Sequence, residues 1–112
     1  MRIGDLSAAT GASARSLRYY EDQGLLQSNR GTGGQRHYPV GAIDRVTLIR
    51  SLLAAGLSTA TIRDVLPCVA DETIRTPWLA DRLTGELRRI ESQMADLRRT
   101  HDILADLVDR YR

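Results

Sequence analysis

The sequence predicts a mainly α-helical chain that consists of a small domain followed by one long helix. Hydrophobic residues make up 42% of the 112 residues, but only 4% are aromatic and none is Phe, so the core must be aliphatic, as in many helix-rich proteins. Apolar residues recur at helical spacing in several short segments, and an unbroken repeat of the coiled-coil type begins at Leu83. We therefore expect a domain over residues 1–70, a connector over 71–76 and a helix over 77–112.

Charge is distributed unevenly along the chain. All 16 basic residues are Arg, and the formal net charge is +2. Residues 1–56 carry a surplus of +3, whereas residues 57–112 carry −1. A polyanionic partner would therefore meet the first half of the chain.

Length and hydropathy restrict the class of protein further. A chain of this size is near the lower limit for burying a self-sufficient core, so we expect a partner chain. No apolar run approaches the ~20 residues of a membrane span, and the first ten residues lack the apolar region of a signal peptide. We expect a cytoplasmic protein without a membrane partner.

The first segment has the pattern of two short helices joined by a tight turn. Ile3, Leu6 and Ala9 recur at helical spacing before Gly11, and Ser13 is placed to cap a second helix that runs to about Asp22. Two helices joined by a short turn that contains glycine form a helix-turn-helix.

The second of these helices has two different faces. Leu17 and Tyr20 share an apolar face, whereas Arg15, Arg18 and Tyr19 share a polar one. The polar face would suit the major groove of DNA, where Arg reaches guanine edges or phosphates and a Tyr hydroxyl reaches the backbone. A simply solvated helix face is the alternative.

A glycine-rich hairpin is expected next. Three glycines lie between the flanks Leu26–Arg30 and Gln35–Tyr38, and Pro39 ends the second strand. Arg30 and Arg36 flank the tip, so this basic hairpin could act as a wing that reaches DNA phosphates. A flexible glycine linker is the alternative, although it would not explain an arginine on each arm.

Two further helices complete the domain. The third begins at Ala42 and is ended by Gly56, and the fourth is capped by Ser58 and ended by Pro67. On the third helix we expect Arg45 on a solvated face, whereas Arg50 could reach the DNA backbone.

The last helix carries the clearest periodic signal. Thr76 and Pro77 resemble an N-cap and first-turn pair. Beyond them, apolar residues and one histidine alternate in steps of four and three over about four heptads, which predicts a dimerising coiled coil. The expected seam consists of Leu83, Leu87, Ile90, Met94, Leu97, His101, Leu104, Val108 and Tyr111. Such a helix would extend ~50 Å, so packing against the chain's own core is the less economical alternative.

Over nearly its whole length the chain resembles the MerR family of bacterial transcription regulators. The resemblance lies in IGDLSAATGASARSLRYYEDQGLL, the GGQRHY wing, IDRVTLIRSLLAAGLS and the terminal coiled coil, in that order. It implies a winged helix-turn-helix homodimer joined by an antiparallel coiled coil. It also implies binding to a pseudo-palindromic operator in double-stranded DNA, within a promoter spacer that is too long, and activation of RNA polymerase by bending and untwisting that spacer. The DNA-binding residues expected by position are Ser13, Arg15, Ser16, Arg18, Tyr19, Arg30, Arg36, His37, Tyr38 and Arg50.

Sensing and catalytic residues are sparse. The single Cys68 cannot build the cysteine sets of the family's metal and redox sensors within one chain, so we expect it to be buried at a helix end. Two Cys68 thiolates from two protomers could share a soft metal only if the fold brought them together. We expect no metal site and no cofactor, and the sequence identifies no effector. Trp78 could line a small-molecule pocket, although packing under the connector is the simpler interpretation.

Two other classes of function remain as alternatives. An architectural or excisionase-like protein could use the same winged helix without regulating a promoter. An enzyme has little support, because His37 and His101 are separated by the whole domain and Cys68 has no local base.

Overall fold

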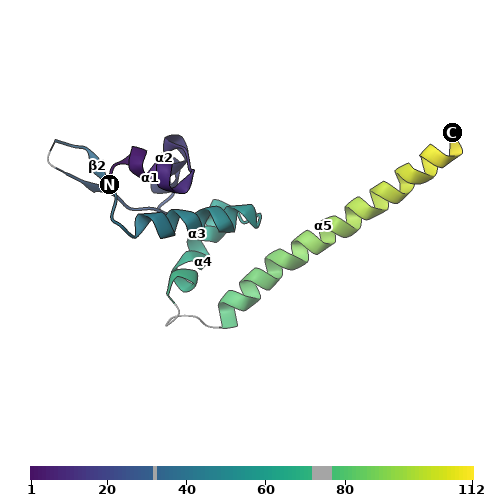
Figure 1. The fold of residues 1–112 in the computed structure, drawn as a ribbon. Coiled ribbons are helices and arrows are strands. Elements are labelled where there is room, and N and C mark those ends of the chain that lie inside the picture. The colour runs from purple at the N-terminus through teal and green to yellow at the C-terminus, as the bar shows by residue number, and fades with distance from the viewer. Residues whose placement is uncertain (32, 72–76) are drawn as a thin grey trace. The chain divides into compact units, whose positions relative to one another are not determined.

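The computed structural model describes residues 1–31, 33–71 and 77–112. The chain divides into two compact units, Met1–Ala70 and Asp71–Arg112. In chain order the elements are α1 (Ile3–Thr10), α2 (Ala14–Asp22), β1 (Asn29–Arg30), β2 (Arg36–His37), α3 (Ala42–Ala54), α4 (Thr59–Ala70) and α5 (Pro77–Arg110) (Figure 1). The mainly helical class is confirmed, with a helix-turn-helix, a wing-like hairpin and a long last helix.

The turn between α1 and α2 follows the predicted sequence signals. Gly11 ends α1 with φ +76°, a left-handed conformation that favours glycine, and its N–H donates to the Ser7 carbonyl at 2.8 Å. The Ser13 side chain then accepts from the Ser16 N–H at 3.1 Å and caps α2. The predicted helix-turn-helix is therefore confirmed in its bounds.

The wing is shorter than its predicted flanks. Its antiparallel strands pair Asn29 with His37 and Arg30 with Arg36. The expected strand from Leu26 is wrong, because Leu26 is only 5% exposed and belongs to the core. Burial of an apolar side chain at this position outweighs extension of the exposed ladder.

The base of the wing is tied to the start of the chain. The Tyr38 N–H donates to the Met1 carbonyl at 2.7 Å, and the Met1 amino group donates to the Tyr38 carbonyl at 3.0 Å. These two bonds hold the wing against the segment that leads into α1.

The core of the first unit is aliphatic, as the composition predicts. Its largest fully buried side chains come from α1 to α4 and from the loop after α2, and they are Leu6, Leu17, Leu25, Val46, Ile49, Ile62, Val65 and Leu66. α1 and α3 contact each other, as do α3 and α4. α2 contacts α1 and joins this core through Leu17 and Tyr20.

One predicted helix end is wrong. Pro67 lies inside α4, which continues through Cys68 to Ala70. Proline has a φ angle that a helix accepts and removes only one backbone donor, at a cost of about 3 kcal/mol. The buried residues Val65 and Leu66 hold this segment in the core, which outweighs that cost.

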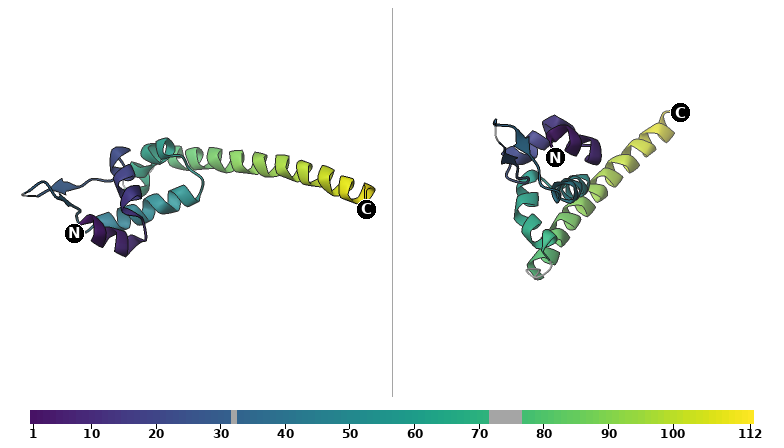
Figure 2. Two further views of the ribbon diagram at one scale, coloured as in Figure 1. Left: turned by 90° about the horizontal axis from the view of Figure 1, so that it is seen from above. Right: turned by 60° about the vertical axis from the view of Figure 1, so that its left-hand side comes forward.

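The second unit consists mainly of α5, a helix of 34 residues without a buried residue (Figure 2). The proposed cap Thr76 and the connector from residue 72 lie outside the described residues. Among the described residues, no helix is both long enough and apolar enough to span a membrane.

Candidate DNA interface

α2 separates a buried face from an exposed one, as the sequence predicts. Leu17 is fully buried and Tyr20 is 6% exposed, whereas Arg15, Arg18 and Tyr19 are exposed. Ser13 is exposed and Ser16 is half-buried; both are engaged in the cap of the helix. The polar face of α2 is therefore free to meet a ligand within this unit.

A hollow of about 420 Å³ lies beside this face. Arg2, Ile3, Arg18, Gln35 and Arg36 line it, so it brings together the start of α1, the helix α2 and the wing. Three of its five residues are arginines and none is acidic. Such a surface attracts a phosphate group through both charge and hydrogen bonds.

Arg2 is a member of this hollow that the sequence analysis missed. It precedes α1, and its backbone N–H donates to the Asp5 carboxylate at 3.1 Å. Sequence spacing gives no relation between residue 2 and residue 36, because the two meet only through the tertiary fold. The one signal in the sequence that could have identified Arg2 was its positive charge within the basic half of the chain.

Tyr38 does not belong to the exposed contact set. It is 2% exposed and its hydroxyl is buried, so the predicted direct contact with DNA is wrong. Burial is the main cause that raises its pKa to about 12, and the nearby Glu21 carboxylate adds to the shift. The tyrosine packs in the core beneath the wing.

The wing presents Arg30 and His37 to solvent. Gly31 lies against His37, since a Cβ atom at position 31 would lie 2.8 Å from His37 Cδ2. A side chain at position 31 would therefore require the His37 ring, which lies beside the turn of the wing, to shift.

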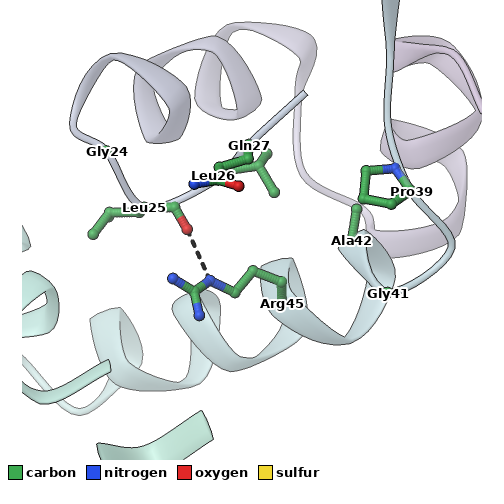
Figure 3. A pocket seen from close by; sticks show the side chains of 8 residues that line it. All are labelled: Gly24, Leu25, Leu26, Gln27, Pro39, Gly41, Ala42 and Arg45. Atoms are coloured by element: carbon green, nitrogen blue, oxygen red, sulfur yellow. Dashed lines mark hydrogen bonds between the residues drawn. The ribbon is translucent and has the colours of Figure 1, made fainter. Parts of the chain in front are cut away.

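Two arginines of α3 make contacts within the unit. Arg50 is exposed, and its Nη1 donates to the carbonyl oxygen of Thr10 at the end of α1. Arg45 is half-buried, and its Nε donates to the Leu25 carbonyl at 2.9 Å beside a cavity of about 360 Å³ (Figure 3). The solvated face expected for Arg45 is therefore wrong, and its burial lowers the pKa of the guanidinium.

The predicted seam of α5 is open in the single chain. Its most exposed apolar members are Tyr111, Leu97 and Met94, at 78%, 70% and 65%. His101 is also exposed, and its Nδ1 lies 3.0 Å from an Asp102 carboxylate oxygen. A contiguous exposed apolar stripe of this kind is uncommon on a monomer.

Near its end α5 is apolar beyond the predicted seam. Ile103 is 64% exposed and Leu107 is 39% exposed, and neither occupies a seam position. The heptad pattern missed them because it selects a single narrow stripe.

Metal-ligating residues are scattered in the described parts of the chain. No group of three or more His, Cys, Asp or Glu side chains lies together among the described residues. Cys68 lies in the last turn of α4, at a helix end as predicted, but it is half-buried, so the expectation of a buried thiol is wrong. The side chain of Trp78 is 45% exposed. Its predicted packing under the connector involves residues that lie outside the described ones.

Comparison with known proteins identifies the family. Residues 1–67 match the MerR HTH family of regulatory proteins, and residues 43–107 match the MerR DNA-binding family. The nodulation protein NolA of Bradyrhizobium elkanii is 39% identical over 107 residues, which cover 95% of this chain. Those residues cover 46% of NolA, so the chain spans less than half the length of this relative. The regulator HmrR of Rhizobium leguminosarum bv. viciae is 27% identical over 96% of this chain and 84% of its own.

Solved structures agree with this assignment. The regulator PbrR691 of Ralstonia metallidurans CH34, in complex with lead(II), has a TM-score of 0.84 and 26% identity over 96% of this chain and 84% of its own. HiNmlR, described as a MerR family regulator that lacks the sensor domain and is bound to promoter DNA, has a TM-score of 0.61 and 25% identity over 98% of this chain and 88% of its own. This chain belongs to the MerR family of transcription regulators.

Proposed function

We propose that the chain acts as a homodimer that binds a pseudo-palindromic operator in double-stranded DNA. The observation that carries this proposal is the hollow in which Arg2, Arg18 and Arg36 meet beside the exposed face of α2. Helix α2 would enter the major groove, where Arg15 and Arg18 read guanine edges, while the wing follows the adjacent phosphates. The complex of HiNmlR with promoter DNA supports this use of the fold.

The second unit supports the proposed dimer. At 34 residues α5 is ~51 Å long, and its seam exposes apolar side chains that a second copy of the same helix would cover. A two-fold dimer presents the same DNA-reading unit twice, which is why its operator should be an inverted repeat.

We further propose that the dimer controls transcription by distorting the spacer between the two promoter elements that RNA polymerase reads. Bending and untwisting a spacer that is too long would bring those elements into register for the polymerase. DNA deformation of this kind costs of order 1–6 kcal/mol, and the phosphate contacts of two wings would offset it. The protein would act in the cytoplasm without chemistry of its own, with no metal or other cofactor assigned and with no identified effector.

One experiment tests these steps together. The protein would select duplexes from a randomised pool, and hydroxyl-radical footprinting would map its contacts on a selected site placed in promoter spacers of different length. Protection of two symmetric half-sites, with transcription that depends on spacer length, is the expected result. Binding without symmetry would contradict the dimeric operator, and binding without any effect on transcription would favour an architectural protein.

A further inference from the structure

Glu21 is an acidic residue that lies on the edge of a basic surface. It occupies the last turn of α2, and its side chain is only 13% exposed. A carboxylate near phosphates weakens binding through repulsion, so its presence here requires a compensating contact.

That contact joins α2 to the wing. Glu21 Oε2 lies 3.6 Å from Nη1 of Arg36 on β2. The other carboxylate oxygen, Oε1, is buried, as is the hydroxyl of Tyr38, and neither atom makes a hydrogen bond of normal geometry within the described ranges. Glu21 also contributes to the raised pKa of Tyr38, so its carboxylate lies near the charged Arg36 and near the buried tyrosine at the base of the wing.

Both wing residues are placed by other bonds as well. Tyr38 is joined to Met1 through two backbone hydrogen bonds, and Arg36 pairs with Arg30 in the hairpin. Arg36 also lines the hollow with Arg2 and Arg18. Glu21 thus links the end of α2 to a wing residue that also lines the hollow.

We propose that Glu21 is a positioning residue for DNA binding, which orients Arg36 and the wing toward the phosphate backbone without contacting DNA itself. This proposal rests on the proposed DNA-binding function. Its consequence is opposite to that of simple electrostatics: removing the negative charge should weaken binding, because the wing loses its anchor.

The test compares two substitutions that remove the same charge from adjacent positions. Glu21→Gln removes the anchor, whereas Asp22→Asn removes an exposed carboxylate one residue further along. On a duplex that the wild-type protein selects from a randomised pool, Glu21→Gln should bind about tenfold more weakly. Asp22→Asn should bind as tightly as the wild type or slightly more tightly. Equal or tighter binding by the folded Glu21→Gln protein would overturn the proposal.

Two further measurements separate positioning from loss of the fold. In an Arg36→Ala background, Glu21→Gln should cost less than it does alone, because the anchored partner is gone. Without DNA, Glu21→Gln should lower the pKa of Tyr38 from about 12, as followed by NMR titration. If Glu21→Gln does not fold, Glu21→Asp keeps the charge and shortens the anchor, and it should also bind more weakly; unchanged affinity of Glu21→Asp would then reject the positioning role.

The outcomes also separate this proposal from the one on which it rests. A wild-type protein that selects no duplex contradicts DNA binding itself, and positioning falls with it. A wild-type protein that binds a selected duplex as tightly as its folded Glu21→Gln variant contradicts positioning alone.

Discussion

The two units of the chain are stabilised in different ways. In Met1–Ala70 the helices bury an aliphatic core, and eight large side chains are fully or almost fully buried. In α5 no residue is buried, and large apolar side chains such as Leu87, Met94 and Leu97 are exposed. The first unit can be understood from its own contacts, whereas the exposed apolar stripe of the second fits the partner helix proposed above.

The largest effect should follow a charge placed in the seam. Met94→Arg would bring like charges together near the two-fold axis of an antiparallel pair of helices, at a cost of about 3–5 kcal/mol in dimer stability. The dimer should dissociate, and operator affinity should fall because one unit reads only a half-site. Sedimentation of the Met94→Arg protein measures how much of it remains dimeric. Ser92→Arg, which adds the same residue on the opposite face of α5, is the control and should remain dimeric; a stable Met94→Arg dimer would show that the seam is misplaced.

A core substitution should produce an effect of similar size but of a different kind. Leu17→Ala removes a fully buried side chain of α2 and should cost about 2–5 kcal/mol. Because the lost contacts lie within the first unit, this loss should be the same at every protein concentration. By contrast, the stability lost in Leu97→Ala should depend on concentration, because Leu97 is exposed in the single chain and would be buried only in the proposed dimer. Chemical denaturation at several protein concentrations measures both losses. If the losses in Leu17→Ala and Leu97→Ala depended on protein concentration to the same degree, the distinction between the two units would be contradicted.

Within the first unit, groove and wing contacts should respond differently to salt. Arg18→Ala should cost about 1–3 kcal/mol on the selected operator and relax its sequence preference. Arg30→Ala should weaken binding to all sequences alike and reduce the slope of affinity against salt by about one. A salt titration of both variants provides the measurement, and identical slopes with identical loss of specificity would contradict the assignment of roles.

The smallest effect is expected at Cys68. The thiol is half-buried near the end of α4, away from the residues that line the basic hollow. Cys68→Ser should therefore leave DNA affinity unchanged and lower the stability of the first unit only slightly. Reporter assays with and without added metal salts or oxidants would check this, and a response present in the wild type but absent from the variant would make Cys68 a sensor.

Local signals allowed much of the fold to be predicted from sequence. Gly11 and Ser13 mark the turn between α1 and α2, and the apolar spacing after Ala42 marks α3. These features depend on residues a few positions apart. Pro67 misled the prediction because tertiary burial of its neighbours outweighed a local helix-breaking tendency.

The candidate site was less predictable because its members are distant in sequence. The polar face of α2 follows from helical spacing alone, but the meeting of Arg2 with Arg36 does not. Tyr38 was assigned to the DNA contacts by its position in the family resemblance; the fold turns its side chain inward instead. Arg45 was misplaced in the same way, since nothing local indicates the Leu25 carbonyl as its partner.

The pairing of Met1 with Tyr38 has a consequence for the order in which the first unit folds. The wing itself contains two residue pairs in the described part of the chain, and a hairpin of that size has little stability on its own. Its support from Met1 spans 37 positions, so the entropy of closing that loop must be spent before the wing gains anything. We therefore expect the helices α1 and α2 to be in place in the folding transition state, and the wing to join them afterwards.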